Sequence, residues 1–321
     1  MNRRVACAAV LLLALACCTS ASDGDGSPVF FRCVRACVGG VCNGTAALER
    51  FRDQQGFFDR ATAWDCDDEC RYACMWTTVA AFRDGGYGVP QFYGKWPFTK
   101  WLGMQEPASA IFSALNLLTH LGMYVEFRRR VRAAAPMFSV WSGYAAFAVN
   151  AWAWSTVFHT RDYRLTEMLD YFCAVLGVLY SFFGLCVRVL GTDRWWKPAV
   201  PGVAILLFFV YHVHYLAFIK FDYGYNMRAN IAVGMVNSVG WLVWFLFKRK
   251  TLPHAYKVAL TVVLVNLLLI LELGDFPPLL WTFDAHSLWH LGTAPLPFLL
   301  YSFFIDDCNF LLDAKEKLKF P

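Results

Sequence analysis

Long apolar runs dominate the chain after Met104, and each is close to the length that crosses a bilayer. The hydrocarbon core is about 30 Å thick, so a spanning helix needs roughly 20 predominantly apolar residues. Trp and Tyr are frequent near the ends of the runs, as is typical of membrane interfaces. The pattern predicts an all-α polytopic membrane protein with a seven-transmembrane-helix bundle. The expected spans are 106–126, 136–158, 167–190, 198–219, 228–247, 256–274 and 284–304.

The segment before the first span has a different pattern. Arg3 and Arg4 precede an apolar stretch, Val5–Cys18, and small residues follow at Thr19–Ser22. This order is typical of a cleaved signal peptide, and the stretch is too short for a signal anchor that spans the bilayer. We therefore expect the mature chain to start outside the cytosol. The expected division is a signal peptide at 1–22, a lumenal cysteine-rich domain at 23–103, a membrane domain at 104–305 and a cytosolic tail at 306–321.

Half of the twelve cysteines lie in the expected lumenal domain. They form two groups of three: Cys33, Cys37, Cys42, Cys66, Cys70 and Cys74. An even number of cysteines behind a signal peptide predicts three disulfides, although the spacing does not choose their pairing. A zinc site is the alternative, since C-x3-C resembles ligand spacing. Asn43 begins a glycosylation sequon in the same domain, which also fits lumenal exposure.

Lys and Arg are unevenly distributed between the loops. Fourteen lie in the tail and in the loops after the first, third and fifth spans, whereas four lie in the opposite loops. The larger set is Arg128, Arg129, Arg130, Arg132, Arg188, Arg194, Lys197, Lys248, Arg249, Lys250, Lys257, Lys315, Lys317 and Lys319. Cytosolic loops carry the excess of basic residues, so the N-terminus is expected in the lumen and the C-terminus in the cytosol.

Composition excludes several classes of protein. Hydrophobic residues make up 58% of the chain and charged residues only 17%, against about 45–50% and 25% in soluble domains. These values exclude a single soluble globule, a disordered chain and a fibrous repeat. The net charge of +5 is too small to indicate nucleic-acid binding.

Several ionisable residues fall within the membrane spans, where they are costly and usually face a bundle interior. His159 ends the second span, Asp170 lies in the first turns of the third, and His286 and His290 begin the seventh. All four are expected in one layer near the lumenal surface. His286 and His290 are four residues apart, so their rings share one helix face; Ser155 and His159 do the same.

Three histidines in one layer predict a zinc site with an open fourth position, which is the arrangement of a catalytic centre. Zinc polarises a carbonyl and lowers the pKa of bound water. Asp170 could accept the proton of that water, and Ser155 could hydrogen-bond the water or the developing oxyanion. The alternative is that the rings of His286 and His290 bond polar groups inside the bundle. Asp162 is a rival for the carboxylate role, but a loop Asp beside Arg161 is more typical of a surface ion pair.

The remaining histidines are expected outside this cluster. His212 and His214 are two residues apart and face different directions, nearer the middle of the fourth span. We expect them to form hydrogen bonds in the bundle interior. His120 lies toward the cytosolic end of the first span and His254 in a cytosolic loop.

The motifs S-x3-H at 155–159, Asp170 and H-x3-H at 286–290 resemble those of the CREST superfamily of seven-span membrane hydrolases, which includes alkaline ceramidases. The resemblance implies that His159, His286 and His290 bind zinc and that Ser155 and Asp170 complete the site. In the ceramidases Glu106 has a counterpart that helps bind calcium. The other calcium carboxylates are missing here from Tyr93–Phe98, so no calcium site is expected and Glu106 is expected to bond within the bundle.

Longer motifs resemble one branch of this superfamily, the post-GPI-attachment to proteins factor 3 family. These motifs are Asn150–Asp162, Gln105–Ser109, Phe221–Asn226, Asp284–His290, Gly94–Phe98 and the Cys70-x3-Cys74-Met-Trp segment. The resemblance implies removal of the unsaturated sn-2 acyl chain from GPI-anchored proteins in the Golgi membrane, with endoplasmic reticulum as an alternative location. A non-catalytic GPI-lipid receptor or chaperone and a ceramidase-like amidase remain the competing functions.

Overall fold

The computed structural model of the chain describes residues 22–317. The predicted signal peptide lies outside the described residues except for Ser22. The described chain contains helices and three isolated β-bridges but no strand. It forms two compact units. The first runs to Ala108 and includes two further segments, His159–Arg161 and Asp275–Ala285; the second contains the rest.

The first unit is organised by two helices that the disulfides join. They are α2 (Pro28–Val41) and α5 (Cys66–Asp84), and α3 (Thr45–Gln54) and α4 (Phe57–Ala61) connect them. Ser27 caps α2 through the N–H of Phe30, and Asp65 begins α5 with a capping box. Both helices therefore start at side chains that satisfy otherwise unpaired backbone N–H groups.

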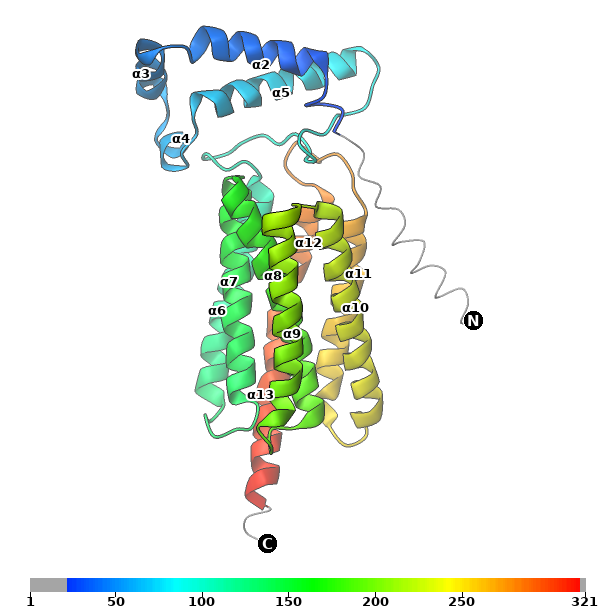
Figure 1. Ribbon diagram of the computed structural model, residues 1–321. Coiled ribbons are helices and arrows are strands. Elements are labelled where there is room, and N and C mark those ends of the chain that lie inside the picture. Colours follow the sequence, from blue (N-terminus) through cyan, green and yellow to red (C-terminus); the bar gives the residue numbers. More distant parts are fainter. Residues whose placement is uncertain (1–21, 318–321) are drawn as a thin grey trace. The chain divides into compact units, whose positions relative to one another are not determined.

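Three disulfides close this unit, as predicted. They join Cys33 to Cys74, Cys37 to Cys70 and Cys42 to Cys66. The numbers of the paired residues rise on one helix as they fall on the other, so α2 and α5 are antiparallel (Figure 1). Spacings of four residues keep Cys66, Cys70 and Cys74 on one face of α5, and Cys33, Cys37 and the C-cap residue Cys42 follow at spacings of four and five along α2. The zinc alternative for these six cysteines is thereby wrong.

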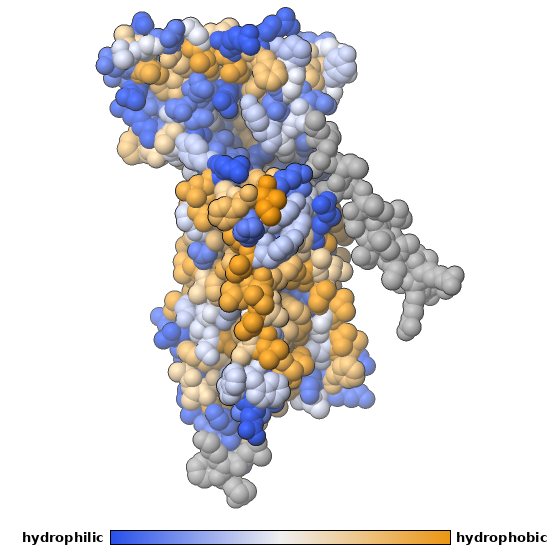
Figure 2. All heavy atoms as spheres, viewed as in Figure 1, coloured by the Kyte–Doolittle hydropathy of each residue, from blue (hydrophilic) through white to orange (hydrophobic). Residues whose placement is uncertain are grey.

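The second unit is a bundle of long helices (Figure 1). They are α6 (Pro107–Arg130), α7 (Phe138–Thr160), α8 (Arg164–Leu190), α9 (Trp196–His214) with a π-helical turn (Tyr215–Ile219), α10 (Tyr223–Lys248), a 3-10 turn (Pro253–Ala255), α11 (Tyr256–Leu273), α12 (Ala285–Thr293) and α13 (Leu296–Lys317). Each of the seven predicted spans coincides with one of these helices or with a pair of consecutive ones. Apolar side chains cover most of the visible bundle surface, as expected of a surface that faces lipid (Figure 2).

Within residues 22–317, six helical segments are long and apolar enough to cross a membrane. The segment Ala285–Lys317, which contains α12 and α13, is one of them. Helix α7 is not among the six, although it has 23 residues. Its Ser, Trp, Tyr and Asn side chains lower its mean hydropathy.

The main hydrophobic core surrounds Trp141 of α7. Its ring stacks on Phe304 of α13 with 4.1 Å between the centroids, and Phe303 meets Trp241 and Trp244 of α10. The ends of α6, α8 and α11 that contain Phe127, Val187 and Val258 contribute to the same cluster. The other ends of α6 and α7 have a polar interior, where the candidate site is found.

Candidate metal centre

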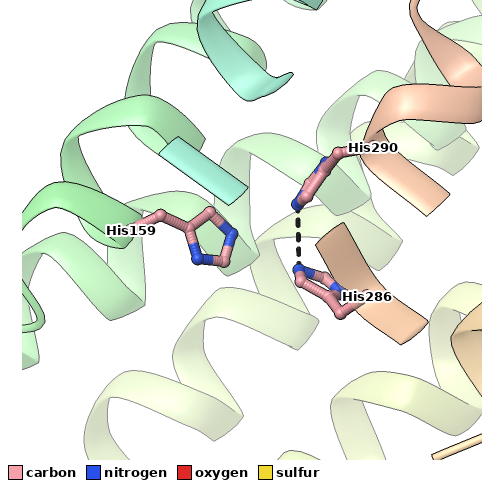
Figure 3. A group of neighbouring side chains, drawn as sticks. All are labelled: His159, His286 and His290. Carbon is pink, nitrogen blue, oxygen red and sulfur yellow. Dashed lines mark hydrogen bonds between the residues drawn. The ribbon is translucent and has the colours of Figure 1, made fainter. Parts of the chain in front are cut away.

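Three histidines from two helices converge in the structure. His159 lies in the last turn of α7, and His286 and His290 lie one turn apart on α12. One ring nitrogen of each lies within 4.8 Å of the others, and no other metal-capable group of three was found in the described residues. His159 and His290 are each 2% exposed. The rings of His286 and His290 face one another, with their Nε2 atoms 2.9 Å apart, and His159 points toward them (Figure 3).

Glu106 orients the ring of His159. Its Oε2 lies 2.8 Å from Nδ1 of His159, and its backbone N–H donates to the carbonyl of His159 at 3.0 Å. The N–H of Gln105 donates to the carbonyl of Thr160 at 3.0 Å. These backbone bonds hold the residues just before α6 against the end of α7. A carboxylate only accepts hydrogen bonds, so Nδ1 of His159 holds the proton and Nε2 presents a lone pair.

The Glu106 carboxylate is buried, and two nitrogen donors, one of them cationic, stabilise it. Lys95 Nζ lies 2.5 Å from Oε1, while His159 contacts the other oxygen. Burial by itself raises the pKa of this carboxyl, but the charge of Lys95 and the hydrogen bonds from Lys95 and His159 outweigh that effect and lower it. Glu106 is therefore ionised, and the expectation that it bonds within the bundle is met by His159 of α7, with Lys95 from the segment before α6 as a second partner.

Glu272 orients the ring of His286 as Glu106 orients the ring of His159. Its Oε2 lies 2.6 Å from Nδ1 of His286, so Nδ1 again donates and Nε2 faces His290. Glu272 is in the last turn of α11. Sequence reasoning missed this residue, although a carboxylate near the end of an apolar span is a recognisable signal.

This geometry fits a zinc ion. Neutral imidazole nitrogens are preferred zinc ligands, and metal-binding histidines usually donate their other N–H to a carboxylate or carbonyl. Two of the three rings satisfy that second condition through Glu106 and Glu272. Three His ligands leave room for a fourth, which is the coordination of a catalytic site.

Helix α12 is held in place by contacts from two other helices. The side-chain amide of Asn116 on α6 donates to the carbonyl of His290 at 2.7 Å, and the hydroxyl of Thr293 donates to the same oxygen at 3.0 Å. A Cβ at Gly292 would overlap the side chain of Leu268, so α11 and α12 approach closely there. The helix ends at Thr293, two residues before Pro295, which cannot continue its hydrogen bonds.

A polar stripe on α6 leads away from the histidines. It consists of side chains three or four residues apart that share the inward face: Ser109, Ser113, Asn116 and His120. The hydroxyls of Ser113 and Ser155 lie 3.1 Å apart, and both residues are buried. Ser155 is thus placed one helical turn from His159, as its spacing indicated, with a partner on α6 that the sequence did not single out.

Asp170 lies on α8, six residues after the helix begins, and is half-buried. It is not a member of the three-histidine group found among the described residues. Its role in proton transfer therefore stays a prediction.

The other histidines lie outside the group, as expected. His212 is fully buried, and its Nε2 lies 3.1 Å from Oδ1 of Asn226. His214 is exposed on the bundle surface, so the expectation that it bonds in the bundle interior is wrong. His214 lies two residues after His212, and side chains two residues apart on a helix point in different directions. His214 therefore faces outward while His212 faces inward. His120 contacts the hydroxyl of Tyr301 and His254 contacts Asp307.

Comparisons with known proteins give one family. A profile of the Per1-like family matches residues 56–308. A zebrafish protein, GPI-specific phospholipase A2-like PGAP3 from Danio rerio, is 47% identical over 97% of this chain and 98% of its own length. The Homo sapiens protein of the same name is 46% identical over 97% of each chain, and post-GPI attachment to proteins factor 3 of Drosophila melanogaster is 43% identical over 94% of each. No solved structure matches the chain.

Proposed function

Because this chain belongs to the Per1-like family, we propose that it is a membrane-embedded zinc-dependent hydrolase that remodels the lipid of GPI-anchored proteins. The names of its relatives support a phospholipase A2-like reaction on that lipid. The reaction proposed is hydrolysis of the sn-2 acyl ester. Water adds to the ester carbonyl carbon, the bond to the glycerol oxygen breaks, and a fatty acid and a lyso-lipid result.

The observation that supports this function best is the convergence of His159, His286 and His290, with carboxylates on Nδ1 of two of them. Zinc in this site would supply a Lewis acid that polarises the ester carbonyl and makes water acidic. Glu106 and Glu272 fix the tautomers and raise the basicity of the rings that they contact.

Ser155 and Asp170 are proposed to handle the charge and the proton. The buried hydroxyl of Ser155, held by Ser113, donates to the ester oxygen as negative charge develops on it. Asp170 accepts a proton from the attacking water and passes it to the departing glycerol oxygen.

The proposed orientation brings this chemistry to the lumenal leaflet. The excess of basic residues in alternate loops places the ends of α7 and α11 and the start of α12 on the lumenal side. The glycerol esters of a lumenal-leaflet lipid lie just below that surface. We therefore propose a Golgi membrane protein with its disulfide-rich N-terminal domain in the lumen.

The test is a lipid analysis of GPI anchors from cells that lack this protein, after rescue with the wild type, His286→Ala or His214→Ala. The first variant removes a metal ligand, and the second is a matched control because His214 is exposed and outside the group. Wild type and His214→Ala are expected to restore loss of the unsaturated sn-2 chain, whereas His286→Ala at equal abundance is not. Equal rescue by all three would make His286 a structural residue and would favour a protein that binds or escorts GPI lipid over a zinc-dependent hydrolase.

A further inference from the structure

A groove on the bundle surface lies between α8, α9 and α10 and has no role in the proposed chemistry. Helix α8 packs against both α9 and α10, and these two form the walls of the groove. Its volume is about 570 Å³. The floor is formed by Leu179 and Phe182 of α8.

The walls of the groove are apolar, and several of the lining residues are small. Ala204 of α9 and Ala229 and Ala232 of α10 line it, with aromatic rings at Phe208 and Tyr225. The lining extends along α10 from Tyr225 to Val236, which is about 16 Å at 1.5 Å per residue. That length is about half of the roughly 30 Å hydrocarbon core, and so equals the depth of one leaflet.

One end of the groove carries a cation. Arg228 is the only charged residue in the lining, and it lies within two turns of the start of α10. A nearby carboxylate, Asp222, interacts with the charges of both Lys220 and Arg228, but its short contacts are with Lys220 at 3.1 Å and with the backbone N–H of Tyr225 at 2.9 Å. Among the described residues, Arg228 forms no hydrogen bond or salt bridge of its own. Its guanidinium is therefore available to an anion from outside the protein.

A buried polar pair stands behind the aromatic wall. The ring of His212 stacks on Tyr225 with 5.2 Å between the centroids, and it also contacts Phe208. His212 is fully buried, bonds Asn226 through Nε2 and has no partner for Nδ1 in the described chain. The stacking fixes the two lining rings, so the groove is preformed rather than opened by its ligand.

We propose that this groove binds the lipid of the substrate: one acyl chain of an inositol phospholipid lies between α9 and α10, with its phosphate on Arg228. Arginine forms bidentate hydrogen bonds with phosphate, and long basic side chains reach the interface from just inside the membrane. An unfilled apolar groove in a membrane span must be occupied by hydrocarbon. The cation at one end favours a lipid whose head group has a net negative charge over one whose phosphate is neutralised by its own choline. This inference rests on the proposed function, because that function supplies the phospholipid-linked substrate.

The test is photo-crosslinking of the purified full-length protein in phosphatidylcholine nanodiscs. Three probes carry the same photoreactive acyl chain: phosphatidylinositol, phosphatidylcholine and diacylglycerol. Phosphatidylinositol is expected to label peptides of α8, α9 and α10 at least five times more than the other two probes. Arg228→Gln is expected to reduce phosphatidylinositol labelling to the diacylglycerol level. Equal labelling by phosphatidylcholine would show a site for bulk lipid and overturn the proposal.

Groove-filling variants test the acyl-chain part. Ala232→Trp and Ala204→Phe fill the groove from opposite walls and are expected to reduce labelling at least fivefold. Val243→Trp is the matched control, since Val243 is 45% exposed on α10 outside the groove. Thermal unfolding in detergent shows whether each groove-filling variant is folded. If one of the two does not fold, the labelling of the other one tests the proposal. Undiminished labelling in a folded groove-filling variant would overturn the proposal.

The same probes separate this inference from the proposed hydrolysis, because labelling needs no turnover. In His286→Ala the labelling is expected to persist while lipid remodelling is lost. If the wild type remodels GPI lipid but phosphatidylinositol labels no part of α8, α9 or α10, the groove proposal fails and the proposed function stands.

Discussion

Nδ1 of His159 lies 2.8 Å from Oε2 of Glu106, a residue more than fifty positions earlier in the chain. The contact leaves Nε2 of His159 facing His286 and His290, so the carboxylate decides which nitrogen is offered to a metal. Lys95 contacts the other carboxylate oxygen and compensates for the burial of its charge. The candidate metal centre therefore consists of the three histidines and of the groups that orient their rings.

Loss of the Glu106 charge is expected to weaken metal binding. In Glu106→Gln the amide oxygen can still accept from Nδ1, but the ring loses a charged partner, and zinc affinity should fall about 10–100-fold. Competition with a zinc chelator on the purified protein measures this change. Glu126→Gln is the control, because Glu126 is a partly exposed residue near the other end of α6 that pairs with Arg130. Equal chelator resistance in both variants would contradict the orienting role.

Ser113 is expected to support the reaction through Ser155, whose hydroxyl is 3.1 Å away. Ser155→Ala should lower turnover by about 10²–10³-fold if its hydroxyl stabilises the developing oxyanion. Ser113→Ala should lower turnover less and leave zinc content unchanged. The control is Thr261→Val, whose hydroxyl donates to the Lys257 carbonyl of its own helix. If Ser155→Ala keeps full turnover, neither Ser155 nor Ser113 takes part in the reaction.

A buried ion pair between Arg188 of α8 and Asp307 of α13, outside the candidate metal centre, is expected to contribute strongly to the stability of the fold. Arg188 binds both oxygens of the fully buried Asp307, at 2.7 and 2.8 Å, and His254 contacts the same carboxylate at 3.2 Å. Asp307→Ala leaves a buried guanidinium unpaired and should destabilise the protein by about 3–5 kcal/mol.

Thermal unfolding in detergent measures the effect of Asp307→Ala. The double variant Arg188→Met/Asp307→Leu should recover part of the loss, because it removes both charges. Asp193→Ala, which removes an exposed partner of Lys197, should cause no measurable change. A similar loss in all three variants would show that the assay does not report on the buried pair.

Glycosylation of Asn43 tests the predicted orientation of the chain in the membrane. It lies between α2 and α3, is exposed and begins the only N-x-S/T sequon in the 321 residues. A lumenal N-terminal domain should carry one glycan, which Asn43→Gln and Thr45→Val remove and Thr45→Ser keeps. Endoglycosidase treatment and gel mobility check this result. The orientation would be contradicted if Asn43 carried no glycan and if protease added to the cytosolic side of intact vesicles cleaved the N-terminal domain.

The three histidines were predictable because each feature that unites them is local. The i, i+4 spacing of His286 and His290 and the position of His159 at the end of a span place them in one membrane layer. Their carboxylate partners were not predictable in the same way. Glu272 reaches His286 across the loop between two helices, and no periodicity connects Glu106 to His159.

The disulfide pairing shows the same limit. Two groups of three cysteines indicate three bonds, but only the antiparallel packing of α2 and α5 decides that Cys33 pairs with Cys74. The second span, 136–158, was predicted as one of the apolar runs, although the polar and aromatic residues of α7 lower its hydropathy. Those residues include Ser155 and His159, so the weak hydropathy signal coincides with the candidate site.

The most direct test of the central claim is one measurement on purified protein that gives zinc content and release of a labelled sn-2 fatty acid from a GPI lipid. The account predicts about one zinc per chain with hydrolysis in the wild type and loss of both in His290→Ala, whose ligand ring is buried in the centre. Full hydrolysis by His290→Ala, or by wild-type protein stripped of its metal, would contradict it.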